Sequence, residues 1–279
     1  MFNRRAVELL YQQNPHDMPG IPEKESLIKD LNDACDYEDL PWKIMNNGFS
    51  RLRNWHFHNT NTKAKDFRFV PFLRRIRLYY TSLYRLKDLL DSLANHDLSE
   101  KSWILRGRIL HHIQDMSCPA HAVPVYHSIN DSYEKNMGRF YDRGNGWPGI
   151  EERINDAMIL ATPLAQTGDG VKDIETIYHE SAHATNRYAN QHKIQSYSGG
   201  MQKPLKMSMF WIEPSGNNFF GSYGPWGEEF GNSPLQDGNG NVYTIMPDEY
   251  RQVYDDLYCK AVRETMEVLY ILSKGVRFL

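Results

Sequence analysis

The chain has few of the features that mark several common classes of protein. Its 279 residues include three cysteines, Cys35, Cys118 and Cys259, with no two closely spaced. Their odd number excludes a disulfide framework, and their spacing is unlike that of a thiolate zinc site. No apolar run is long enough to cross a bilayer, so we expect no transmembrane segment. The net charge is only −3, which provides no general attraction to polyanions such as duplex nucleic acid.

The chain also lacks repeats, low-complexity tracts and a basic-apolar leader of the secretory type at its start. The composition is typical of a folded protein with its own core. Apolar residues make up 41% of the chain, which is enough for a hydrophobic core. Aromatic residues reach 13%, with 17 tyrosines, which favours polar aromatic surfaces and pocket walls.

Apolar residues recur at three- and four-residue steps along most of the chain, as in amphipathic helices. Helices are predicted over residues 4–13, 26–34, 69–93, 99–116, 127–140, 150–165, 171–192 and 247–272. Residues 35–65 are polar and irregular. Residues 196–242 are rich in glycine, asparagine, proline and aromatics, which predicts a long loop or small hairpin. The expected fold is all-α: a single multi-helix domain over residues 1–279, with any metal cluster between facing helices.

The sequence Leu-His-His-Ile-Gln-Asp-Met-Ser-Cys-Pro-Ala-His over residues 110–121 is the most informative part of the chain. His111 and Asp115 are four residues apart, so a helix places both on one face. Pro119 limits how far that helix can run, and His121 follows two residues later. This spacing predicts a metal site at the end of a helix.

A second group of ligand-type residues follows closely. His127 and Asp131 repeat the four-residue spacing, and Glu134 stands about one turn further on. Imidazole nitrogen mixed with carboxylate oxygen suits zinc, above all in a site that keeps one position open for water.

The pattern His-x-x-x-Asp-x-x-x-Pro-x-His, filled here from His111 to His121, resembles that of the zinc-dependent phospholipase C family. This family is related to the fungal single-strand-specific zinc nucleases. The resemblance is tightest over this motif and fair from Asp39 to Asp131. It implies an exported enzyme, periplasmic or extracellular, that hydrolyses phospholipid or another phosphodiester, with single-stranded nucleic acid as the substrate of the related branch. No obligate protein partner is evident.

The resemblance extends upstream of the motif. Family members carry an acidic ligand and then a histidine, and these roles fall on Asp39 and His56. His58 is an alternative to His56, because residues two apart in an extended segment point the same way.

The resemblance also implies how the ligands are grouped. One zinc would be held by Asp39, His56, His111 and Asp115, and a second by His121, His127 and Asp131. Glu134 competes with Asp131 for the last position. Asp115 is the candidate bridge between the ions, and Asp39 the candidate group that orients or deprotonates the attacking water. The family's third zinc needs an N-terminal Trp and a following His, which this chain lacks. Two zinc ions are therefore expected from this sequence. Either a natural N-terminal segment stands ahead of Met1, or this member has only the paired site.

Two other functions compete with phosphodiester hydrolysis. The sequence His179-Glu180-Ser181-Ala182-His183 is a His-Glu-x-x-His motif within a helical pattern. It would make the chain a zinc metalloprotease with Glu180 as base, or it is simply a polar helix face. The other function is that of a catalytically inactive member of the family, which would bind zinc, or would bind lipid without cleaving the lipid.

Aromatic residues of the segment 196–242 allow two interpretations. They are Trp211, Phe219, Phe220, Tyr223 and Trp226. They would line a substrate cleft or a choline-binding cage, or they pack the loop itself.

Overall fold

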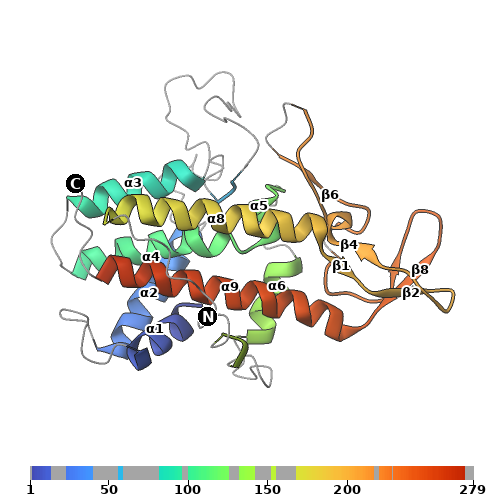
Figure 1. Ribbon diagram of the computed structural model, residues 1–279, viewed down its shortest axis with the longest axis horizontal. Coiled ribbons are helices and arrows are strands. Elements are labelled where there is room, and N and C mark those ends of the chain that lie inside the picture. The colour runs from blue at the N-terminus through green and yellow to red at the C-terminus, as the bar shows by residue number, and fades with distance from the viewer. Residues whose placement is uncertain are drawn as a thin grey trace.

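The computed structural model describes residues 2–13, 23–39, 56–58, 82–95, 100–125, 132–141, 152–154, 168–216, 220–227 and 229–273. Most of these residues are helical (Figure 1). The helices are α1 (Phe2–Gln13), α2 (Lys24–Asp39), α3 (Ser82–Ala94), α4 (Glu100–Asp115), α5 (Pro119–Ala122), α6 (Ser132–Tyr141), α8 (Gly170–Gln191) and α9 (Pro247–Ser273).

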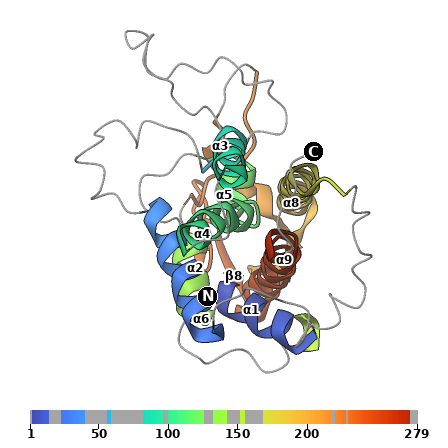
Figure 2. The ribbon, with the colours of Figure 1, turned by 90° about the vertical axis from the view of Figure 1, so that its left-hand side faces the viewer.

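Four long helices, α3, α4, α8 and α9, run side by side and are seen nearly end-on in Figure 2. Helix α4 is central, since it packs against α2, α3 and α9, while α1 covers α9. Leu110 and Ile113 of α4 are fully buried, as are Val262 and Leu269 of α9. The amphipathic pattern therefore forms one continuous core, and α4 carries the His111 motif into it.

Helices α2 and α4 approach closely at Gly107. A Cβ atom added there would lie 2.5 Å from the Cβ of Ala34 and 2.9 Å from the carbonyl oxygen of Leu31. Glycine normally weakens a helix, but here its missing side chain lets two backbones pack together.

Residues 193–245 depart from the all-α expectation. They form short antiparallel strands: β1 (Lys193–Ile194), β2 (Ser196–Ser198), β3 (Met201–Gln202), β4 (Leu205–Lys206), β5 (Trp211–Ile212), β6 (Ser222–Tyr223), β7 (Leu235–Gln236) and β8 (Val242–Ile245), with a 3₁₀ turn η3 (Met207–Met209). One sheet has the order β3-β2-β8-β7, and β1-β4 and β5-β6 form two-stranded sheets. The fold is mostly helical rather than strictly all-α, because backbone pairing satisfies the polar groups of this long segment.

The aromatic residues of this segment mainly form core. Trp211 and Trp226 are almost fully buried, with Phe210 and Phe230 packed beside them. These two tryptophans therefore pack the segment and do not line a cleft. Phe220 is partly exposed, and Phe219 lies outside the described residues.

One helix boundary was predicted wrongly. Residues 35–39, expected to be irregular, continue α2 as far as Asp39. Cys35 and Glu38 are buried on the side of α2 that faces the protein, so tertiary contacts extend the helix. The predicted helical residues 69–81, 127–131 and 155–165 lie outside the described part of the chain.

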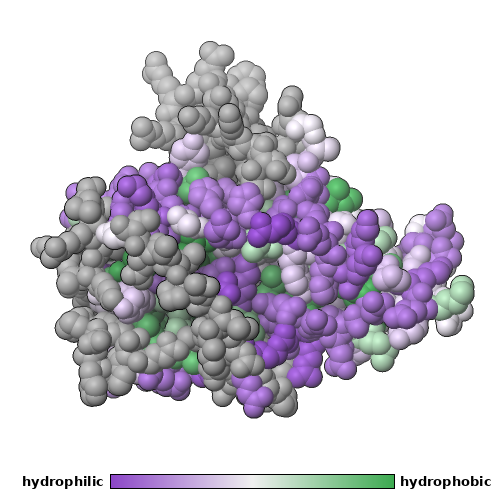
Figure 3. All heavy atoms as spheres, viewed as in Figure 1, coloured by the Kyte–Doolittle hydropathy of each residue, from purple (hydrophilic) through white to green (hydrophobic). Residues whose placement is uncertain are grey.

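No helix in the described ranges combines the length and apolar content needed to cross a bilayer. The face of the molecule in Figure 3 is mainly hydrophilic along α8 and α9, with apolar atoms showing in small areas.

Candidate metal centre

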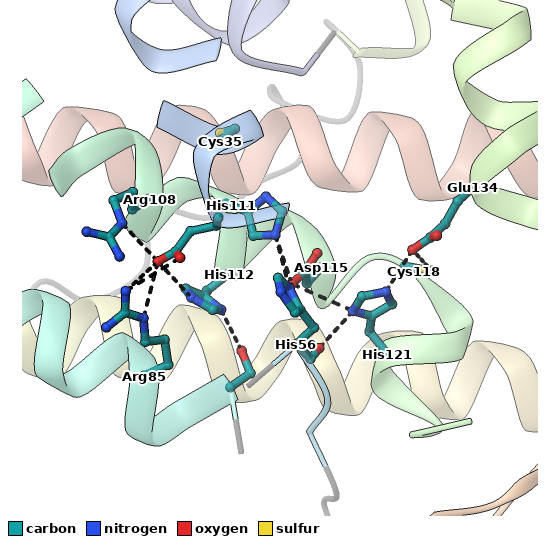
Figure 4. A network of polar contacts seen from close by, with 12 residues as sticks. Cys35, His56, Arg85, Arg108, His111, His112, Asp115, Cys118, His121 and Glu134 are labelled. Atoms are coloured by element: carbon teal, nitrogen blue, oxygen red, sulfur yellow. Dashed lines mark hydrogen bonds and ion pairs between the residues drawn. The ribbon is translucent and has the colours of Figure 1, made fainter. Parts of the chain in front are cut away.

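Three ligand-type atoms from two distant segments converge at the end of α4 (Figure 4). His56 Nδ1 lies 3.0 Å from Asp115 Oδ2 and 3.2 Å from His111 Nε2, and His111 Nε2 lies 3.4 Å from the same Asp115 oxygen. Zinc–nitrogen bonds of about 2.0–2.1 Å in a tetrahedral site place neighbouring ligand atoms roughly 3.3 Å apart. The triangle formed by these atoms therefore has the dimensions of one face of a zinc coordination shell.

The segment that carries His56 is fixed on both sides by hydrogen bonds. His58 N donates to the backbone oxygen of His121 at 3.1 Å, and Ser82 N donates to that of Phe57 at 3.0 Å. The Phe57 ring is buried and stacks on the His121 ring at 5.1 Å. These contacts place His56 against α4 although it is remote in the sequence.

His121 is held in one orientation by the backbone of His56. His121 Nδ1 lies 2.7 Å from the carbonyl oxygen of His56. A carbonyl oxygen only accepts, so Nδ1 carries the proton and donates. The other nitrogen, Nε2, points toward Glu134 Oε1 at 2.7 Å, and the Cys118 thiol donates to the same oxygen at 3.5 Å. A backbone carbonyl on one ring nitrogen is the usual arrangement for a histidine that binds metal through the other.

The charges at this site reinforce one another. Burial disfavours the Asp115 carboxylate, but the His111 and His121 imidazoles outweigh it and hold the pKa of Asp115 well below its usual range. Burial likewise disfavours the charged His121 ring, yet Asp115 and Glu134 raise its pKa well above the usual value. The Asp115 carboxylate thus retains its charge beside the protonated His121 imidazole, and a divalent cation would replace the imidazole proton.

Two overlapping groups of side chains in the described ranges could hold a metal ion. The first is His56, Asp115 and His121, and the second is Cys118, His121 and Glu134; within each group the candidate ligand atoms lie within 4.8 Å of one another. His111 joins the first group through its short distances to His56 and Asp115. The donor set of nitrogen, carboxylate oxygen and one thiol fits a transition metal such as zinc.

The predicted ligands have different outcomes. His56, His111, Asp115 and His121 do come together. Glu134, the predicted alternative to Asp131, lies against His121. His127 and Asp131 fall outside the described residues, and so does the side chain of Asp39, although its backbone ends α2. These three assignments stay predictions.

Two further residues bear on the predicted ligand set. His58, the alternative to His56, belongs to neither candidate group and instead contacts the rings of Tyr178 and His179. Cys118 was not predicted as a ligand, because the sequence signature of a thiolate metal site is a pair of closely spaced cysteines. Its position three residues before His121 was the available signal.

A buried ion network supports the site from the α2 side. Glu38 accepts from Arg85 Nη2 at 3.0 Å and from Arg108 Nε at 2.9 Å. Burial opposes ionisation of Glu38, but the His112 imidazole and the Arg85 guanidinium overcome it and lower its pKa to about 2. His112 Nδ1 in turn lies 3.1 Å from Ser82 Oγ, and the His112 ring stacks on His56 at 5.8 Å. Glu38 is therefore occupied by arginines and joins α2, α3 and α4 beside the metal ligands.

The His-Glu-x-x-His motif lies on α8, where His179 is half-buried and both Glu180 and His183 are exposed. Among the residues that the structure describes, these histidines do not join a third ligand to form a compact group. Burial, together with repulsion by His179 and His183, lowers the pKa of the neighbouring His58 to about 3. That histidine is therefore neutral near neutral pH.

Comparison of the chain with protein-family models, with curated proteins and with solved structures found no match.

Proposed function

We propose that the chain is a zinc-dependent phosphodiester hydrolase of the phospholipase C type. The observation that carries the proposal is the triangle of His56 Nδ1, His111 Nε2 and Asp115 Oδ2, with sides of 3.0, 3.2 and 3.4 Å. The resemblance of residues 111–121 to the zinc-dependent phospholipases C adds the reaction class.

The first zinc would be held by His56, His111 and Asp115, with Asp39 as the predicted fourth ligand. His121 and Glu134 would hold the second, with His127 and Asp131 as further predicted ligands. Bound zinc would lower the pKa of a coordinated water toward ~7 and offset the negative charge of a phosphodiester.

The side chain of Asp115 and the backbone of His56 hold the predicted zinc ligands in place. Asp115 Oδ2 lies 3.0 Å from His56 Nδ1 and 3.6 Å from His121 Nδ1, so its carboxylate stands between the two groups of ligands. The His56 carbonyl fixes the His121 ring. We assign Asp39 to accept the proton of the attacking water, as a carboxylate within hydrogen-bond reach can do.

Turnover of bis-p-nitrophenyl phosphate tests this function. We expect the zinc-loaded protein to hydrolyse it, a chelator to abolish turnover, and added zinc to restore it. His111→Ala should remove activity, whereas His192→Ala, whose ring stacks on Tyr188 at 4.5 Å, should not. Undiminished turnover after complete zinc removal would refute the proposal.

A single-strand nuclease is the second candidate. Phe220 is partly exposed and meets Phe57 edge-to-face at 5.2 Å, while Phe57 stacks on His121. The partly exposed Phe220 ring, held beside the metal ligands by Phe57, would favour an unpaired base, because bases stack on aromatic rings. Activity measured in parallel on phosphatidylcholine micelles and single-stranded DNA separates the two candidates. Phe220→Ala should weaken the reaction with DNA more than that with the small diester.

A further inference from the structure

Cys118, His121 and Glu134 bring three different donor types to one point at the start of α5. Glu134 Oε1 lies 2.7 Å from His121 Nε2 and 3.5 Å from Cys118 Sγ. The cysteine and the histidine are buried, and Glu134 is partly exposed. Figure 4 shows the Glu134 carboxylate beside one edge of the His121 ring, whose other edge faces Asp115 and the carbonyl oxygen of His56.

The backbone holds these donors in place. Cys118 has an extended conformation, φ −89° and ψ 122°, and its carbonyl oxygen accepts from the backbone N–H groups of His121 and Ala122, both at 3.1 Å. Pro119 begins the short helix and fixes its first turn. The three-residue step from Cys118 to His121 thus places thiol and imidazole on one side of the turn, where α6 supplies the carboxylate.

The other two cysteines lie in different surroundings. Cys35 Sγ donates to the carbonyl oxygen of Gly107 at 3.1 Å, and Cys259 lies in the core of α9, where burial raises its thiol pKa to about 12. Cys118 is the one cysteine in the described ranges that belongs to a group able to hold a metal.

We propose that Cys118, His121 and Glu134 form a metal site with a thiolate ligand, next to the site of His56, His111 and Asp115. The inference deepens the proposed function, on which it rests for the metal. Binding breaks the S–H bond of Cys118 and the Nε2–H bond of the protonated His121 ring and forms a sulfur–metal and a nitrogen–metal bond. Both protons leave to water with no change of oxidation state. His121 binds through Nε2, because Nδ1 donates to the His56 carbonyl.

This ligand set makes the two sites chemically unequal. The first has only imidazole nitrogen and carboxylate oxygen, whereas the second adds a soft sulfur donor. Thiolate favours softer metal ions, and carboxylate favours harder ones. The Cys118 site should therefore retain zinc, cobalt or cadmium against a competing hard ion such as magnesium.

Cobalt titration of the metal-free full chain tests the proposal. Thiolate bound to Co²⁺ produces an intense near-ultraviolet charge-transfer band, which imidazole and carboxylate ligands do not. We expect the band in the wild-type protein and its loss in Cys118→Ser, while Cys259→Ala, the matched buried cysteine, keeps it. Glu134→Gln should retain the band but weaken cobalt binding about 10-fold or more.

X-ray absorption of the zinc-loaded wild-type protein is a second test, which depends on no variant. A zinc–sulfur distance of about 2.3 Å is expected. A spectrum with nitrogen and oxygen neighbours alone, or a cobalt band that survives in Cys118→Ser, would overturn the proposal. These readouts are independent of turnover. An inactive protein with the thiolate band would defeat phosphodiester hydrolysis, and an active protein without it would defeat only the thiolate site.

Discussion

His111 Nε2 and His56 Nδ1 lie 3.2 Å apart, although 55 residues separate them in the chain. Two imidazoles this close, with the Asp115 carboxylate against both, repel each other when both are protonated. A shared cation relieves that repulsion and uses the same lone pairs. Substitution of either histidine should therefore change the affinity of the protein for a metal ion.

Loss of His111 should strongly reduce metal affinity. Mutation of a residue that only hydrogen-bonds to a metal ligand commonly lowers metal affinity about 10–100-fold. Removal of a direct ligand should therefore lower zinc affinity more than about 100-fold. Zinc dissociation constants from competition with a chromophoric chelator measure the effect in His111→Ala. His192→Ala should bind zinc as the wild type does, and equal affinities in the two variants would remove His111 from the site.

Glu38 should contribute to the stability of the fold by pairing with Arg85 and Arg108. Its side chain is only 3% exposed, and removing one partner of such a network leaves buried charge uncompensated. We expect Glu38→Gln to lower the free energy of unfolding by about 2–4 kcal/mol, as measured by urea denaturation.

The matched control is Glu25→Gln, which removes an exposed carboxylate that also pairs with an arginine, Arg4, at 3.2 Å. Exposed pairs of this kind contribute about 0–1 kcal/mol. If both substitutions have the same small effect, the Glu38 network does not stabilise the fold.

The contribution of Glu38 should depend on pH in a defined direction. Its pKa is lowered from 4.5 to about 2, so folding favours the ionised form. The resulting stability, about 3 kcal/mol at most, is fully present above pH 4.5 and is lost as the pH falls toward 2. The stability difference between wild type and Glu38→Gln should therefore shrink between about pH 5 and about pH 2. A difference that stays constant or grows on acidification would contradict this assignment.

Gly107→Ala should destabilise the protein although alanine is the better helix former. The new methyl group would meet Ala34 Cβ at 2.5 Å and force α2 and α4 apart. Inserting a methyl group into this packed contact should cost about 1–3 kcal/mol of stability. The better helix propensity of alanine contributes only about 1 kcal/mol, which at most cancels that cost. Thermal unfolding measures the change. The control is Gly238→Ala, which should have little effect because no atom lies within 4 Å of the added Cβ. A stabilised Gly107→Ala protein would show that α2 and α4 are not in close contact.

Much of the helical framework was predictable, because its signal is local. The periodicity predicted residues 171–192 and 247–272 as helical, and α8 and α9 occupy Gly170–Gln191 and Pro247–Ser273. Residues 196–242 were predicted as a long loop or small hairpin, and β2 and β3 do form a hairpin there. The number and pairing of the other strands were not predicted, because most are two or three residues long and leave no alternation to detect.

The candidate site was predictable where its ligands lie close together in the sequence. His111, Asp115 and His121 followed from helical spacing and the proline turn. The position of His56 came only from the family resemblance, since backbone pairing with Ser82 and His121 holds its segment in place. The arginine partners of Glu38 depend wholly on tertiary packing, so spacing alone could not reveal them.

We propose that one metal ion is held jointly by His56, His111 and Asp115. The most direct test is an anomalous-difference map, recorded at the zinc absorption edge, from crystals of the full chain grown with zinc. We expect a zinc peak bonded to His56 Nδ1, His111 Nε2 and Asp115 Oδ2 at about 2.0–2.2 Å from each. The same crystals with no zinc peak between these residues, and with their side chains turned apart, would contradict it.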